Sequence, residues 1–170
     1  KFQRHIEEML ISPVPNYIIL IGFVGGGVAR GLTVGVAVTI VSLVFHPLNM
    51  HSLWVMSSMI LLTSILFSLA GLINGVYAKS FDDISIVPTF VLTPLTYLGG
   101  IFYSISLLPE FWQQASLVNP ILYMVNAFRY GFLGVSDISL ALSYAISIGF
   151  IVVLYLFSLY LLRTGHGIRT

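Results

Sequence analysis

The chain has 170 residues, of which 58% are hydrophobic and only 8% are charged, whereas a water-soluble domain carries roughly 25% charged residues. A soluble domain of this composition would lack a polar surface to present to water, so the composition excludes that class and indicates a protein embedded in lipid. The net charge of +1 and the absence of cysteine exclude a strongly basic surface for nucleic acid, disulfides, cysteine-based zinc sites and thiol nucleophiles.

The first segment, residues 1–12, is predicted to be a short amphipathic helix. Its apolar side chains repeat at i, i+4, i+7 and i+8, at Phe2, Ile6, Met9 and Leu10. This is the spacing of one helical face, and Pro13 and Pro15 end the helix. From the pattern alone, a helix on the membrane surface explains the segment as well as a helix that binds a partner. Because the sequence begins with Lys1 and not with Met, we expect further sequence before it.

Four apolar stretches are each long enough to cross a bilayer, which takes about 20 helical residues. They run over about residues 17–45, 53–77, 84–103 and 140–162. The stretches are continuously apolar and do not alternate as barrel strands do, and helices satisfy their own backbone groups in lipid. We therefore predict an all-α integral membrane protein, with residues 13–170 forming a domain of four transmembrane helices.

Arg30 lies near the middle of the first predicted span, where a cation costs about 2.5–3.5 kcal/mol on insertion scales. Such a residue is expected to face the protein interior, a polar group of a neighbouring helix or a wet cavity. The alternative is that the long span shifts outward and Arg30 snorkels to the cytoplasmic surface.

Glycines surround Arg30 at four-residue spacing. They form two adjacent rows on the predicted helix: Gly22 and Gly26 in one, and Gly27, Gly31 and Gly35 in the other. Small residues at this spacing allow two helices to approach closely in lipid. The pattern predicts tight helix packing, within the chain or between subunits, and indicates no particular function.

The third predicted span contains Pro88 and Pro94 together with threonines at positions 89, 93 and 96. Proline removes a backbone donor, and nearby hydroxyls can satisfy the carbonyls that lose their partner. A kinked helix lined with hydroxyls suits a translocation path, and it suits simple bending equally well.

No segment offers a catalytic or metal-binding arrangement. Asp82 and Asp83 fall in a tight turn before the third span and are predicted to be solvated, while His46 and His51 share a short loop with too few further ligands. Residues 75–80 lack the glycine that a P-loop has directly before its lysine. We therefore expect neither an enzyme nor a metal site in this chain.

Residues 108–134 are too polar and too broken for one span. Pro109 and Glu110 suit a helix start, Asn119-Pro120 breaks that helix, and residues 121–132 can form a second one. The two short helices are predicted to dip into the outer leaflet as a re-entrant hairpin. The alternative is an interfacial loop rich in Trp and Tyr.

The basic residues predict the orientation. One side of the membrane receives Lys1, Arg4, Lys79, Arg163 and Arg169, if four helices cross in sequence. The other side receives only Arg129, which could pair with Glu110 or Asp137. The positive-inside rule then places both termini in the cytoplasm.

Several of these patterns together resemble the permease subunits of type-2 ABC exporters. The matching stretches, in chain order, are Ile6–Pro13, Gly22, Arg30–Gly31, Pro94, Gly99–Gly100, Phe102, Leu108–Pro109, Asn119–Pro120, Tyr123 and Arg129. Residues 6–13 are similar to the Glu-x-Leu-x-x-Ser/Thr-Pro stretch of the family's cytoplasmic coupling helix. Residues 119–129 are similar to the Asn-Pro-x-x-Tyr-x-x-x-x-x-Arg stretch of its outer re-entrant helices. The resemblance covers nearly the whole chain, and the order and spacing of the motifs make it specific.

The resemblance implies a mechanism and partners. Family members have six spans and these four match the last four, which implies that the N-terminal spans are missing here. Two permease subunits would pair, as a homodimer, above ABC-type ATPase subunits on separate chains, and those subunits would bind the ATP and Mg²⁺ while this chain holds no cofactor. The coupling residues would be Phe2, Ile6, Glu7, Glu8, Met9 and Leu10.

The implied activity is export of a hydrophobic, lipid-linked or saccharide substrate across the inner membrane. The alternative is a structural or assembly membrane protein that transports nothing. Copurification with a Walker-motif ATPase would distinguish the two.

Overall fold

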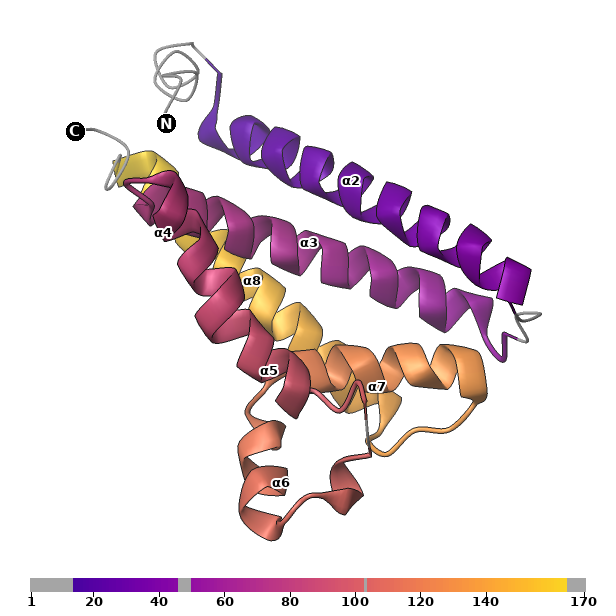
Figure 1. Ribbon diagram of the computed structural model, residues 1–170. Helices are drawn as coiled ribbons and strands as arrows, with labels where there is room; N and C mark the ends of the chain where they lie inside the picture. The colour runs from indigo at the N-terminus through magenta and orange to yellow at the C-terminus, as the bar shows by residue number, and fades with distance from the viewer. Residues whose placement is uncertain (1–13, 46–49, 103, 165–170) are drawn as a thin grey trace.

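The computed structural model describes residues 14–45, 50–102 and 104–164, and these residues form helices joined by short connections, without a β-strand (Figure 1). The amphipathic segment 1–12, with its predicted coupling residues, lies outside the described residues.

Three helices are long and apolar enough to cross a membrane. They are α2 (Asn16–Phe45), α3 (Leu53–Tyr77) and α8 (Leu140–Thr164). Their ends lie within two residues of the first, second and fourth expected spans. Ser52 starts α3, where its hydroxyl accepts a hydrogen bond from the Val55 amide at 3.5 Å.

The third expected span differs from the continuous helix over residues 84–103. The structure has three consecutive short segments instead: α4 (Phe81–Ile86), the π-helical turn η1 (Val87–Leu92) and α5 (Thr93–Leu98). The helical stretch begins earlier because Ser80 and Asp83 form a capping box at its start. It ends earlier because Gly99 and Gly100 follow, and Gly100 has φ +72°, a left-handed conformation that favours glycine.

The prolines explain why this stretch contains a π-helical turn. The Thr93 amide donates to the Pro88 carbonyl, five residues back, and the Thr93 hydroxyl donates to the same oxygen at 3.1 Å. The Thr96 hydroxyl donates to the Leu92 carbonyl at 2.7 Å. Threonine hydroxyls therefore contribute to the hydrogen bonding around Pro94, as expected of a helix that contains proline in lipid.

Helix α3 lies at the centre of the fold and contacts α2, α7 and α8. Its residues contribute to two buried clusters. One cluster joins α2, α3 and α8 through Leu20, Leu69, Val76, Leu161 and Leu162. The other joins α3 to α7 through Met59, Leu66, Met124 and Ala127. These clusters fix α3 as the element against which the other long helices are placed.

Two short helices, α6 (Glu110–Leu117) and α7 (Pro120–Leu133), lie at one end of the long helices (Figure 1). The start of α2, the end of α3 and the end of α8 lie together at the opposite end. At 1.5 Å per residue α7 is about 21 Å long, so it is shorter than a hydrocarbon core of about 30 Å. It ends at Gly134, which has φ +72°.

Candidate functional site

Helix α7 and its N-cap carry a row of polar side chains that bond backbone and side-chain groups of neighbouring segments. The first is Asn119, which is 2% exposed. Its Oδ1 accepts the Ile121 amide at 3.0 Å and caps α7, while its Nδ2 donates to the Leu95 carbonyl of α5 at 2.6 Å. That carbonyl is available because α5 ends at Leu98, and the Gly99 amide donates to Thr96 instead. Asn119 therefore joins the end of α5 to the start of α7.

Tyr123 connects α7 to α6. Its hydroxyl donates to the Leu117 carbonyl at 2.7 Å, at the last residue of α6. The side chain is buried, so the bond satisfies both a buried phenol and a helix-end carbonyl. In the Asn-Pro-x-x-Tyr stretch, Asn119 thus caps the start of α7, and Tyr123 bonds the end of α6.

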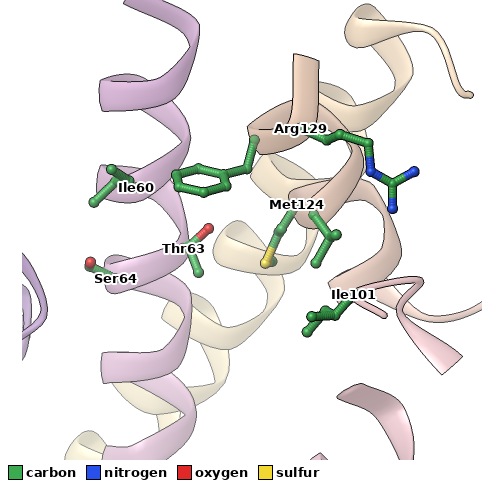
Figure 2. A pocket seen from close by; sticks show the side chains of 8 residues that line it. Ile60, Thr63, Ser64, Ile101, Met124 and Arg129 are labelled. Carbon is green, nitrogen blue, oxygen red and sulfur yellow. The ribbon is translucent and has the colours of Figure 1, made fainter. Parts of the chain in front are cut away.

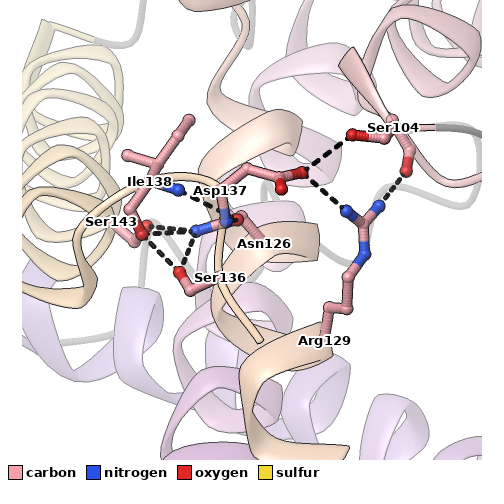
Figure 3. Close-up of polar contacts among 8 residues, drawn as sticks. Ser104, Asn126, Arg129, Ser136, Asp137, Ile138 and Ser143 are labelled. Carbon is pink, nitrogen blue, oxygen red and sulfur yellow. Dashed lines mark hydrogen bonds and ion pairs between the residues drawn. The ribbon is translucent and has the colours of Figure 1, made fainter. Parts of the chain in front are cut away.

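Asn126 connects α7 to the turn before α8. Its Nδ2 donates to the Ser136 hydroxyl and the Ile138 carbonyl, each at 2.9 Å. Its Oδ1 accepts the amides of Asp137 at 2.9 Å and Ile138 at 3.3 Å. The residue is 2% exposed, so one buried amide side chain holds the whole turn (Figure 3).

Arg129 connects α7 to the segment after α5. One of its nitrogens donates to Asp137 Oδ2 at 2.9 Å, and the other donates to the Gly100 carbonyl (Figure 3). The sequence allowed either Glu110 or Asp137 as the partner of Arg129, and the structure pairs Arg129 with Asp137. Glu110 is exposed in the first turn of α6, whose N-cap is Pro109.

A cavity of about 500 Å³ lies between α3 and α7. Its lining includes Ile60 and Ile101, and Thr63 of α3 points toward Met124 of α7, as Figure 2 shows, while the Arg129 guanidinium points away from Thr63. The lining is mainly apolar. The guanidinium nitrogens of Arg129 donate to Asp137 and to the Gly100 carbonyl, so they are not free to bind an occupant. This space suits an apolar occupant.

A second cavity of about 440 Å³ lies on the other side of α3, against α2. It is lined by Gly27, Arg30, Gly31, Val34, Thr63, Ser64, Phe67 and Ser68. Arg30 is exposed in the described structure. Thr63 and Ser64 line both cavities, so this short stretch of α3 lies between the cavity beside Arg129, whose guanidinium is paired, and the cavity beside Arg30.

The glycine rows of α2 divide by their surroundings. A Cβ at Gly27 would lie 2.2 Å from Ser68 Oγ, and a Cβ at Gly31 would lie 2.8 Å from Ser64 Oγ. A Cβ at Gly22, Gly26 or Gly35 would meet nothing within 4 Å. Within this chain, the close approach of α2 to α3 therefore depends on Gly27 and Gly31.

The first turn of α4 carries the carboxylates that sequence reasoning expected to be solvated. Asp83 Oδ2 accepts the amides of Lys79 at 2.9 Å and Ser80 at 3.0 Å. These hydrogen bonds hold the pKa of Asp83 below its ordinary value of 3.8. Asp82 is exposed and Asp83 is half-buried, and the described residues contain no group of three or more potential metal ligands. Asp83 therefore acts as a helix cap.

Sequence reasoning missed the roles of two asparagines, of which Asn126 is buried and Asn74 is half-buried. Asn74 of α3 donates to the Ile84 carbonyl at 2.9 Å, and Asn126 holds the turn at residues 136–138. The available signal was an amide side chain inside an otherwise apolar helix, next to a proline-containing or turn segment. The serines at positions 64 and 68, opposite the α2 glycines, were also missed.

Comparison with known proteins places these features in a family. Residues 1–133 match the family model described as "ABC-2 type transporter". The chain is 59% identical over 171 residues to the inner membrane transport permease YadH of Escherichia coli K12, covering 100% of this chain and 66% of that protein. It is 26% identical over 161 residues to Nodulation protein J of Rhizobium leguminosarum bv. viciae, covering 95% of this chain and 62% of that protein. No solved structure matches the chain.

Proposed function

We propose, because this chain belongs to the ABC-2 type transporter family, that it forms the membrane path of an ATP-driven exporter. The chain spans 66% of the length of its YadH relative, so the proposal concerns the activity of the whole protein. Export of a hydrophobic, lipid-linked or saccharide substrate fits the apolar cavity between α3 and α7. It also fits the exposed aromatic side chains of α6, Phe111 and Trp112.

The observation that carries the proposal is the backbone satisfaction around α7. A helix pair that enters the membrane without crossing it persists only where protein satisfies its free carbonyls. Asn119, Tyr123 and Arg129 donate to the carbonyls of Leu95, Leu117 and Gly100. This supports α6 and α7 as a re-entrant pair at the outer end of the path.

The stretch α4–η1–α5 is proposed as the fourth crossing. Its 18 residues, 81–98, rise about 27 Å if each contributes 1.5 Å, with the first turn of α4, which carries Asp82 and Asp83, at the membrane surface and the apolar remainder in the hydrocarbon core. The five-to-one distribution of basic residues supports cytoplasmic placement of both ends of the chain in an inner membrane.

The proposed partners are a second permease subunit and separate ATPase subunits, which would bind ATP and Mg²⁺. Residues Phe2, Ile6, Glu7, Glu8, Met9 and Leu10 would contact the ATPase, with the apolar side chains in its groove and the two glutamates at the rim. This follows from the amphipathic spacing before the first span, and those residues lie outside the part of the chain that the structure describes.

The proposal is tested by purifying the protein from membranes in mild detergent, identifying copurified ATPases and measuring ATP-dependent transport in vesicles. Copurification of an ATPase with Walker motifs is expected. In the double variant Ile6→Asp, Met9→Asp, the ATPase should still hydrolyse ATP, but this hydrolysis should no longer drive transport. Arg4→Asn, on the opposite face of the predicted helix, is the matched control and should transport normally.

One result would contradict the exporter function, and another would contradict only the coupling role. Absence of any ATPase, together with no effect of nucleotide, would favour a structural or assembly protein. Normal transport by the double Asp variant would remove the coupling role of residues 2–10 while leaving the permease role intact.

A further inference from the structure

Arg30 lies at mid-depth in the helix pair formed by α2 and α3. It is about 14 residues from Asn16, which is roughly 21 Å along the helix. The register of the pair supports the same depth, because Gly31 packs against Ser64, which is near the middle of α3. The helix packing therefore does not support the outward shift that would let Arg30 snorkel to the surface.

No carboxylate lies on the helices that pack around Arg30. The sequences of α2, α3 and α8 contain neither Asp nor Glu. Asp137 is already paired with Arg129, which lines the other cavity. Among the described residues, Arg30 makes no hydrogen bond or ion pair, although a guanidinium remains charged under all physiological conditions. Its counter-charge must therefore come from outside these helices.

The cavity beside Arg30 supplies hydroxyl groups as well as the cation. Thr63, Ser64 and Ser68 of α3 line it. Ser68 donates to the Ser64 carbonyl at 2.6 Å, while the hydroxyls of Thr63 and Ser64 make no hydrogen bond within the described residues. Val34 and Phe67 add apolar surface. A guanidinium with neighbouring hydroxyl donors suits an oxyanion with several acceptor oxygens, and the apolar surface suits a hydrocarbon chain.

We propose that Arg30, Thr63 and Ser64 bind the phosphate group of a phosphate-bearing lipid amphiphile as it crosses the membrane. The proposal rests on the exporter function and specifies its substrate class. A resident phospholipid keeps its phosphate at the surface, about 15 Å from the bilayer centre. A phosphate at the depth of Arg30 therefore belongs to a molecule in transit, and its negative charge offsets the cost of a cation at that depth.

The test uses the protein purified with its partners and reconstituted in uncharged-lipid nanodiscs, without nucleotide. Binding of lysophosphatidic acid is compared with binding of the monoacylglycerol that has the same chain and lacks the phosphate. The wild-type protein should prefer the phosphate form by about tenfold or more, as expected for charge-assisted hydrogen bonds. Arg30→Met should remove this preference, and Arg30→Lys should retain part of it.

Matched controls separate the site from general charge and from folding. Arg163→Gln removes a cation at the end of α8 and should leave the preference unchanged. Ser64→Ala should reduce the preference by severalfold, whereas Ser57→Ala, an exposed serine on the same helix, should not. If Arg30→Met fails to fold, the Ser64 and Ser57 pair still decides the question.

Three results would overturn the proposal. The first is equal preference in Arg30→Met and wild type. The second is displacement of the amphiphile by inorganic phosphate alone, which would indicate a site for a free anion. The third is loss of subunit assembly in Arg30→Met with unchanged lipid preference, which would indicate a protein carboxylate as the partner. Because binding is measured without nucleotide, absence of an ATPase would contradict the exporter function separately.

Discussion

The side chain of Asn74 on α3 donates a hydrogen bond to the Ile84 carbonyl, and the residue four positions further along, Pro88, has no N–H to donate to that carbonyl. In a regular helix the amide of residue 88 would be the partner of Ile84. A side chain from the preceding helix thus substitutes for the donor that proline removes. The same bond ties α3 to α4 across the turn at residues 78–80.

Asn74→Leu should destabilise the protein by about 1–3 kcal/mol, because it leaves a carbonyl unsatisfied. Pro88→Ala restores a backbone donor next to Ile84, so the cost of Asn74→Leu should be smaller in that background. Thermal unfolding in detergent of the four variants of this double-mutant cycle measures the coupling. Additive effects of the two substitutions would show that Asn74 and Pro88 act independently.

Gly27→Ala should destabilise the packing of α2 on α3 by about 1–3 kcal/mol, because its Cβ would lie 2.2 Å from Ser68 Oγ. Gly26→Ala is the matched control, since a Cβ there meets nothing within 4 Å. Alanine is the better helix former by about 1 kcal/mol, so this control should be neutral or stabilising. Chemical denaturation of the two variants in the same detergent gives the comparison, and equal effects would contradict the assigned helix contact.

Asn119→Asp should separate the two roles of Asn119. Aspartate keeps the oxygen that caps α7 but loses the donor to the Leu95 carbonyl. Hydrogen exchange should accelerate at residues 96–100 and change little at residues 121–123. Asn119→Ala should accelerate both regions and cost about 1 kcal/mol through the lost cap alone. Unchanged exchange at residues 96–100 in Asn119→Asp would exclude the link to α5.

The capping box of α4 should make the start of that helix sensitive to acid. The pKa of Asp83 is lowered in the folded protein, so its contribution to stability is complete above its ordinary value of 3.8 and is lost as pH falls through the lower folded value. Amide exchange at residues 81–84 should therefore increase as pH falls below about 4, after correction for intrinsic rates. In Asp83→Asn this additional pH dependence should disappear, while Asp82→Asn should retain it.

The sequence pattern was sufficient for the long helices and insufficient for the proline-rich stretch. Residues 53–77 are uniformly apolar between a serine cap and a polar turn, and α3 has those bounds. The stretch expected over residues 84–103 is equally apolar at its end, but hydropathy carries no information on the left-handed glycine at position 100. Local backbone geometry, rather than transfer to lipid, decides where α5 ends.

The residues of the candidate site were predictable to different degrees. Asn119, Tyr123 and Arg129 were recognised from the family resemblance, and Arg30 from the cost of a cation at mid-membrane. Among their partners, Asp137 was one of the two acids expected for Arg129. The carbonyls of Leu95 and Gly100 were not predicted, because these residues lie 24 and 29 positions away from Asn119 and Arg129 in sequence. A carbonyl has no signature in the amino-acid sequence, so such contacts emerge only from the fold.

The hydrogen bonds of Asn126 constrain which amino acids that position can hold. Both ends of its amide are engaged: three acceptors, on Ser136, Ile138 and Ser143, face the nitrogen, and two backbone amides face the oxygen. Aspartate has the same shape but no N–H, glutamine places the amide one methylene further out, and leucine would leave the amides of Asp137 and Ile138 without their acceptor. Among the twenty amino acids, asparagine alone satisfies this turn, so a saturation library at codon 126 should return essentially a single functional residue.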